Sequence, residues 1–77
     1  MKEIKVLGPG CPKCEELLQL VNQAAKDLAL ECHIEKITDI QAIIEYGILM
    51  TPALVVDKQV VMVGKVPALA DIKKMIG

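Results

Sequence analysis

The sequence predicts an α/β fold with the element order β-α-β-α-β-β-α. Short aliphatic runs of strand length alternate with stretches in which apolar residues recur every three or four positions. The hydrophobic fraction is 53%, yet Tyr46 is the single aromatic residue, so the core must be built from aliphatic side chains, as in a covered sheet. A chain of 77 residues is the length of one domain, residues 1–77, with a thin core.

The first half of the chain predicts a strand, a long helix and a second strand. Residues 2–7 alternate polar and apolar and then become apolar, and the run Gly8-Pro9-Gly10 ends this strand. Residues 11–30 then follow a helical period with one apolar face. The members of that face are Cys14, Leu17, Leu18, Val21, Ala25 and Leu28. Residues 31–37 predict the second strand, with Cys32 and Ile34 on one side and Ile37 on the other.

A short second helix is predicted between residues 38 and 47. Thr38 and Gln41 have the spacing of a capping box, in which the hydroxyl and the amide satisfy the first backbone donors. Ile40, Ile43 and Ile44 would line one face of this helix, and Gly47 would end it.

The last third predicts two paired strands and a final helix. Residues 53–56 are wholly apolar, which is typical of a central strand. Residues 57–59 have the length of a hairpin connection to residues 60–63, although they lack glycine. Pro67 is expected to start the last helix. Its apolar face would be Leu69, Ile72 and Ile76.

Two cysteines in the run Gly10-Cys11-Pro12-Lys13-Cys14 carry the chemistry of the chain. They follow a predicted strand and open a predicted helix, where free backbone N–H groups and the helix dipole favour a thiolate. We therefore expect the pKa of Cys11, at the helix tip, to lie below that of an ordinary thiol. Cys14 falls on the buried face, so the spacing separates an attacking thiol from a sheltered one. Pro12 suits a first helical turn, and Lys13 adds positive charge.

Composition argues against nucleic acid and membrane partners. The net charge is −1, and the nine basic residues are scattered lysines, so there is no basic stripe for a phosphate backbone. Stacking aromatics are also missing. No signal peptide or apolar run of membrane-spanning length is seen, so we expect a cytoplasmic protein. In that compartment a Cys-x-x-Cys is more often catalytic or metal-binding than structural.

The chain resembles the thioredoxin-like fold in its minimal, glutaredoxin-sized form. The cysteine pair after the first strand is one signature of that class. Thr51-Pro52 before the third strand and Gly64 before the last helix fall where the family places them. Together with Tyr46-Gly47 these motifs are similar to those of the small redox-active disulfide proteins. The resemblance implies a four-stranded mixed sheet flanked by three helices, and a cis proline at Pro52 that faces the active disulfide.

The resemblance implies a thiol–disulfide oxidoreductase that reduces or exchanges protein disulfides. The catalytic residues would be Cys11 and Cys14. The substrate-binding residues would be Thr51, Pro52, Pro12 and Lys13. The Cys11–Cys14 disulfide would be the only redox group, with no other cofactor and no metal. The partners would be protein disulfides and an electron donor like thioredoxin reductase, and the protein would be a monomer.

Alternative interpretations belong to other functional classes. A soft-metal domain would bind copper(I) or zinc through Cys11 and Cys14, with Cys32 and His33 as further ligands. The helix predicted at residues 38–46 and the Thr-Pro step distinguish this chain from such domains. A purely structural disulfide is disfavoured, because so small a ring removes little unfolded-state entropy. A non-catalytic adaptor is the third possibility.

If the chain is a redox protein, either Lys13 or a water molecule would accept the proton of Cys14.

Overall fold

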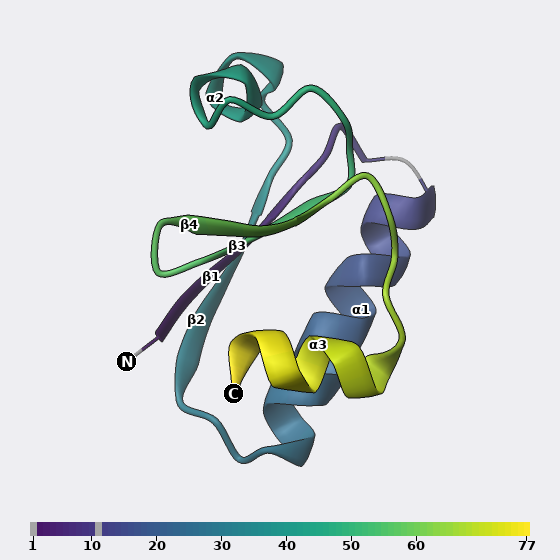
Figure 1. Ribbon diagram of the computed structural model, residues 1–77, viewed down its shortest axis with the longest axis vertical. Helices are drawn as coiled ribbons and strands as arrows, with labels where there is room; N and C mark the ends of the chain where they lie inside the picture. Colours follow the sequence, from purple (N-terminus) through teal and green to yellow (C-terminus); the bar gives the residue numbers. More distant parts are fainter. Residues whose placement is uncertain (1, 11) are drawn as a thin grey trace.

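The computed structural model describes residues 2–10 and 12–77, so Cys11 lies outside the described residues. The predicted element order is confirmed (Figure 1). The elements are β1 (Lys2–Leu7), α1 (Pro12–Asp27), β2 (Cys32–Ile37), α2 (Ile40–Glu45), β3 (Ala53–Val56), β4 (Gln59–Val63) and α3 (Leu69–Ile76). Within the described part of the chain, none of the helices combines the length and apolar character that crossing a bilayer requires.

The four strands form one mixed sheet, as predicted, and their order across the sheet is β2-β1-β3-β4. β1 runs parallel to β2 and antiparallel to β3, and β3 runs antiparallel to β4. β3 is therefore an inner strand, which accounts for the burial of all four of its residues. The last pair of the β1–β3 register joins Leu7 to Ala53. The loop after β1 and the segment before β3 consequently emerge at the same edge of the sheet.

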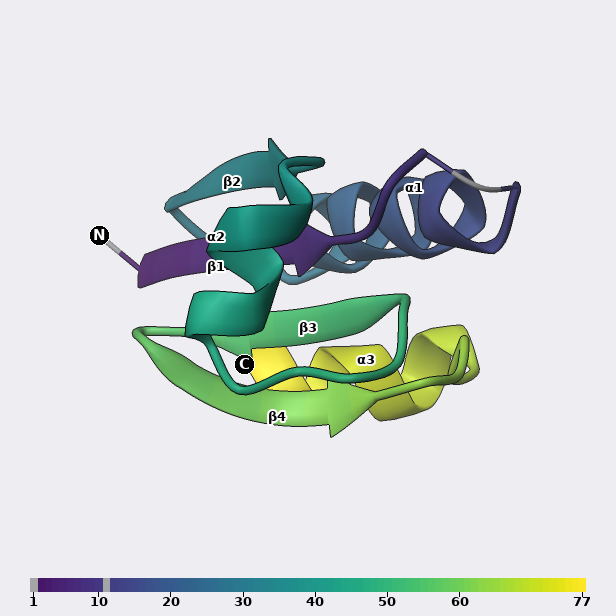
Figure 2. The same cartoon turned by 90° about the horizontal axis from the view of Figure 1, so that it is seen from above.

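Helices cover both faces of the sheet. The side chains of β1 point alternately to the two faces and therefore belong to two separate cores. Ile4 and Val6 point toward α1 and α3, whose apolar faces complete the larger core. Leu7 points to the other face, where Ile43 of α2 and Ile48 form a smaller core. Figure 2 shows α2 in front of the strands and α3 behind them. The smaller core lies beside the edge from which the loop after β1 leaves.

α1 ends at Asp27, three residues before the predicted end. The amide of Leu30 donates to the carbonyl of Ala25 over 2.9 Å, and the amide of Ala29 donates to that of Lys26 over 3.1 Å. This is a Schellman turn, with Ala29 in the left-handed position at φ 50° that glycine usually occupies. Leu28 is consequently 41% exposed and not part of the core. The buried face includes Ala24 in its place.

The starts of the two shorter helices also differ from the prediction. Asp39, not Thr38, caps α2, and its carboxylate accepts a hydrogen bond from the Gln41 amide over 3.1 Å. α3 starts at Leu69 after an extended Ala68, so Pro67 lies outside the helix. The hairpin turn consists of residues 57 and 58, both with positive φ, and Gln59 already belongs to β4. The tight turn thus forms without the glycine that such turns prefer.

Candidate functional site

Three loops meet at the edge of the sheet where β1 ends. The Gly8 amide extends the β1–β2 pairing by donating to the carbonyl of Ile37 over 2.9 Å. On the other side, the Gly64 amide donates to the carbonyl of Pro52 over 2.7 Å, which extends the β3–β4 pairing. The loop after β1, the segment before β3 and the segment after β4 are thereby fixed side by side. α1 begins at this edge with Pro12.

Cys14 lies in the first turn of α1 and faces inward. Its side chain is 1% exposed. Gly8 borders its sulfur, since a methyl group built on Gly8 would collide with Cys14, and the same methyl group would lie in contact with Thr51. The apolar face of the predicted helix therefore does bring Cys14 under the loop after β1. The predicted position of Cys11 at the exposed tip falls outside the described residues.

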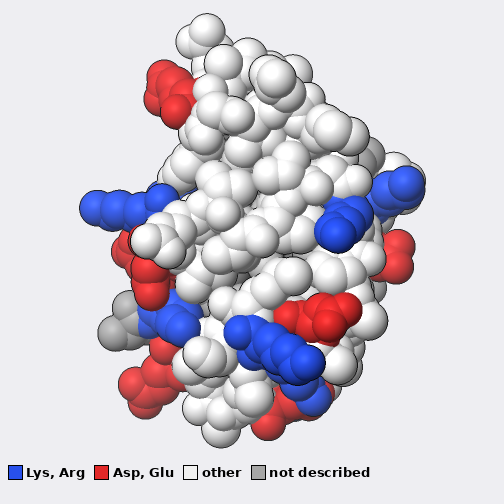
Figure 3. All heavy atoms as spheres, in the orientation of Figure 1, with Lys and Arg blue, Asp and Glu red and all other residues white. Residues whose placement is uncertain are grey.

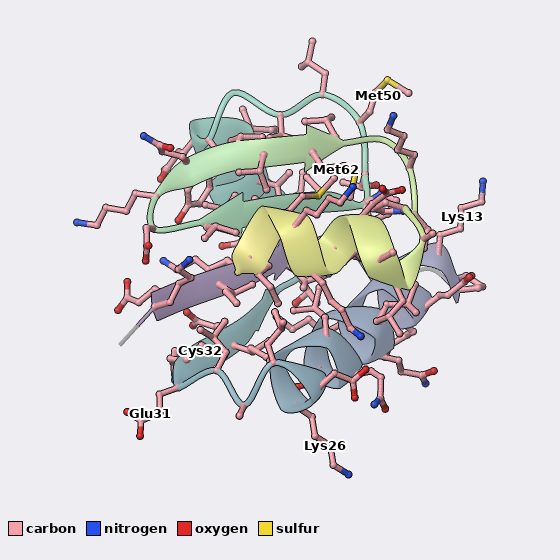
Figure 4. The ribbon with its side chains drawn as sticks, turned by 60° about the horizontal axis from the view of Figure 1, so that its bottom comes forward. Lys13, Lys26, Glu31, Cys32, Met50 and Met62 are labelled. Carbon is pink, nitrogen blue, oxygen red and sulfur yellow. The ribbon has the colours of Figure 1, made fainter. Side chains whose placement is uncertain are left out.

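The residues predicted to bind substrate differ in their accessibility. The Thr51–Pro52 peptide bond is cis. Pro52 is completely buried, whereas Thr51 is half-buried. Pro12 and Lys13 are exposed on the first turn of α1, and Figure 4 shows the Lys13 side chain extending away from the protein. Thr51 thus lies next to Gly8, which borders Cys14, while Pro12 and Lys13 lie exposed on the first turn of α1.

An apolar groove that the sequence did not reveal opens next to this edge. It has a volume of about 340 Å³ and runs from the loop after β1 to α2. Its lining residues are Pro9, Ile40, Ile43, Ile44, Ile48, Leu49 and Thr51. Ile40 and Ile44, predicted to share one face with Ile43, are 60% and 58% exposed, whereas Ile43 is buried in the smaller core. Figure 3 shows that the face of the molecule near α2 is mostly uncharged, while charged side chains gather lower down.

Tyr46 binds a lysine and does not line the groove. Its hydroxyl lies 3.1 Å from Nζ of Lys5, and this hydrogen bond raises the pKa of Lys5 above its ordinary value. The same ammonium lies 5.9 Å from the centre of the ring. Lys5 pairs with Val55, two residues before the end of β1.

Among residues 2–10 and 12–77 no polar or charged side chain is buried, so the described part of the chain offers no buried carboxylate beside Cys14.

Comparison with known proteins agrees with this architecture. Residues 2–77 match the family model described as a thioredoxin domain. The chain is 35% identical over 74 residues to a thioredoxin of Methanocaldococcus jannaschii, across 96% of this chain and 85% of that protein. It is 33% identical over 76 residues to a thioredoxin of Methanothermobacter thermautotrophicus, across 99% of both chains.

The chain belongs to the thioredoxin domain family. The predicted thioredoxin-like fold and the predicted class of enzyme, a thiol–disulfide oxidoreductase, are therefore confirmed.

The two further ligands considered for a soft metal, Cys32 and His33, lie far from Cys14 in this thioredoxin domain. Cys32 starts β2 opposite Lys2, at the far end of β1 from the loop that borders Cys14. A strand of that length spans about 16 Å, too far for Cys32 or His33 to share an ion with Cys14. Figure 4 shows Cys32 at the end of the molecule away from Lys13. Cys32 instead packs, half-buried, against the larger core, as expected for a small apolar residue.

Proposed function

We propose that Cys11 and Cys14 are the redox pair of this thioredoxin domain, with Cys11 attacking and Cys14 resolving. The burial of Cys14 in the first turn of α1 carries the proposal. A protein disulfide cannot reach a sulfur that is 1% exposed, so the first attack falls to Cys11. Cys11 directly precedes the first residue of α1 in the sequence, where the positive end of the helix dipole favours a thiolate.

The proposed reaction has two exchange steps. The Cys11 thiolate attacks one sulfur of the substrate disulfide, forming a mixed disulfide and releasing the other substrate sulfur as a thiolate. Cys14 then loses its proton to water and attacks the Cys11 sulfur. The Cys11–substrate bond breaks as the Cys11–Cys14 bond forms, and the second substrate thiolate leaves. Two electrons pass from the protein dithiol to the substrate, and the substrate thiolates take up protons from solvent.

The apolar groove supports a protein segment as the substrate. It begins at Pro9, two residues before Cys11 in the sequence, and at Thr51. None of the described residues that line it is charged, so an extended apolar segment beside the substrate disulfide would bury its side chains there without stranding a charge. The backbone at Thr51 would hold the substrate strand near the reacting sulfurs. Pro12 and Lys13 would contact the substrate from the helix side.

Reduction of insulin disulfides by dithiothreitol, with and without the protein, tests the assignment. Wild-type protein should accelerate the reaction, and Cys11→Ser should remove that acceleration. Cys14→Ser should form a mixed disulfide with the substrate and turn over slowly at most. Cys32→Ser is the matched control and should retain full activity, because Cys32 lies at the other end of the sheet. Retention of activity by Cys11→Ser together with its loss in Cys14→Ser would reverse the roles.

A reductase related to thioredoxin reductase is the proposed electron donor, because the oxidised pair must be reduced after each turnover. Reduction of the oxidised protein by a fractionated cell extract with a nicotinamide cofactor identifies that enzyme. The monomeric state and the cytoplasmic location stay predictions.

A further inference from the structure

Gly8 is buried and held firmly at the end of β1. Its amide donates to the carbonyl of Ile37 over 2.9 Å, and the preceding residue, Leu7, pairs with Ala53. The backbone at Gly8 is therefore fixed between two neighbouring strands. Moving Gly8 away from the start of α1 would disturb this pairing.

A side chain at residue 8 would collide with the buried cysteine. A Cβ atom built on Gly8 lies 2.1 Å from Sγ of Cys14 and 3.0 Å from its Cβ atom. The same position is 3.8 Å from Cβ of Thr51, an ordinary contact. Real Cβ atoms do not approach other heavy atoms to 2.1 Å, so a methyl group there would displace the sulfur.

The need for glycine here is steric, not conformational. Gly10 and Gly47 have φ values of 92° and 76°, and no atom lies within 4 Å of a Cβ built on either. Gly8 is the reverse case, because its φ lies outside the left-handed range and its Cβ position is occupied. Alanine at residue 8 would thus have an acceptable backbone, and the side chain of Cys14, its sulfur above all, would be in its way.

We propose that Gly8 is a positioning residue for the second exchange step. It leaves room for the sulfur of Cys14 directly beside the backbone at the end of β1, at the edge of the sheet that also carries Thr51. This inference rests on the proposed roles of Cys11 and Cys14. Alanine at this position would shift the resolving sulfur by about 1 Å, and a misplacement of that size can slow a reaction by about 100-fold.

The two steps can be followed separately with one equivalent of 5,5′-dithiobis(2-nitrobenzoic acid) added to the reduced protein. The first coloured thiolate reports attack by Cys11, and the second reports ring closure by Cys14. All variants carry Cys32→Ser so that the third thiol does not contribute. With Gly8→Ala we expect the first release at the parent rate and the second slowed by roughly 10-fold to 100-fold.

Gly47→Ala is the matched control, because it introduces the same methyl group at a glycine with positive φ and open surroundings. It should lower stability yet leave both releases at the parent rate. Equal second-step rates in Gly8→Ala and the parent would overturn the inference, as would equal slowing in Gly47→Ala. Failure of the proposed function is distinct, because the parent protein itself would then not release two thiolates in sequence.

A stability measurement decides the matter if Gly8→Ala folds poorly. Cys14→Ala removes the sulfur that the new methyl group would meet. We therefore expect Gly8→Ala to lower the urea midpoint much less in a Cys14→Ala background than in the parent. The same decrease in both backgrounds would show that the sulfur is not what Gly8 accommodates.

Discussion

The amide nitrogen of Gly64 lies 2.7 Å from the carbonyl oxygen of Pro52 and donates a hydrogen bond to it. This contact joins the end of β4 to the segment that precedes β3, and so fixes one side of the candidate site. Gly64 has a φ of 78°, and a Cβ atom built on it would lie 3.2 Å from Cε of Met50. Both the backbone conformation and the neighbouring side chain therefore favour glycine.

We expect Gly64→Ala to lower the free energy of unfolding by about 1–2 kcal/mol, because alanine is strained at positive φ. Urea unfolding followed by circular dichroism measures this. Gly47→Ala has the same backbone problem in open space, so it should cost the same or slightly less. The Met50 side chain is flexible and 62% exposed, so it can move aside at little cost. A neutral effect of Gly64→Ala would contradict the assigned backbone strain.

The ion pair between α1 and α3 gives a pH dependence of stability. Asp27 Oδ2 lies 3.1 Å from Nζ of Lys73, and the hydrogen bond from Lys73, followed by that from Gln23, lowers the pKa of Asp27 below its ordinary value of 3.8. The folded protein thus favours the carboxylate more than the unfolded chain does. The resulting stabilisation is present above about pH 4 and is lost as pH falls through the lower pKa of the folded state.

We therefore expect Asp27→Asn to be less stable than wild type at pH 6, with the difference shrinking toward pH 2. Urea midpoints measured across that range test it. Glu16→Gln, on the exposed side of the same helix, controls for the loss of one negative charge. A stability difference that stayed constant down to pH 2 would show that the ion pair does not stabilise the folded state.

Leu54 provides the test of the larger core. It is 0% exposed in β3 and packs in the cluster that contains Ile4 and Ile72. Leu54→Ala should lower the free energy of unfolding by about 2–5 kcal/mol, because it removes buried methyl groups and leaves a cavity. Leu49→Ala makes the same chemical change at a side chain that is 93% exposed, and should alter stability by less than about 0.5 kcal/mol. Similar losses in the two variants would contradict this placement of the core.

The strands and their order along the chain could be predicted closely from the sequence. Lys2–Leu7 and Ala53–Val56 have the predicted bounds, because their apolar patterns are unbroken and glycine or proline stands next to each. The helix boundaries were less predictable. Ala29 occupies a left-handed position without glycine, and Asp39 competes with Thr38 as a cap. The residues at which these helices begin and end depend on hydrogen bonds in the folded chain, which the residue types alone do not determine.

The candidate site was predictable in part. The helical period placed Cys14 on a buried face, and Thr51-Pro52 was found from its position in the family pattern. The exposure of Ile40 and Ile44 could not be foreseen, because a short helix leaves open how many of its apolar residues reach the sheet. The close approach of Gly8 to Cys14 could not be predicted from the sequence either, because a glycine in a loop indicates a turn as readily as a close contact.

The groove predicts a difference between protein and small-molecule substrates. Leu49 lines the groove and is 93% exposed, so Leu49→Ser should leave the fold intact. A client side chain that packs on Leu49 would lose this contact in the variant. Burying one leucine stabilises a complex by about 1.5–3 kcal/mol, so we expect kcat/KM for insulin to fall by about 10-fold or more. The rate with 5,5′-dithiobis(2-nitrobenzoic acid) should not change, because that molecule needs only the reacting sulfur.

Val61→Ser is the control for this prediction. Val61 is a 38% exposed apolar residue of β4 that does not line the groove. It should affect neither substrate, whereas Ile44→Ser, within the groove, should repeat the effect of Leu49→Ser. If Leu49→Ser slowed the reactions with insulin and with the small disulfide equally, Leu49 would act on the reacting sulfurs and not on protein binding. If Val61→Ser slowed the reaction with insulin alone, β4 and not the groove would bind the substrate. Selective loss confined to Leu49 and Ile44 assigns protein recognition to α2 and the loop that follows it, separate from the chemistry at Cys11 and Cys14.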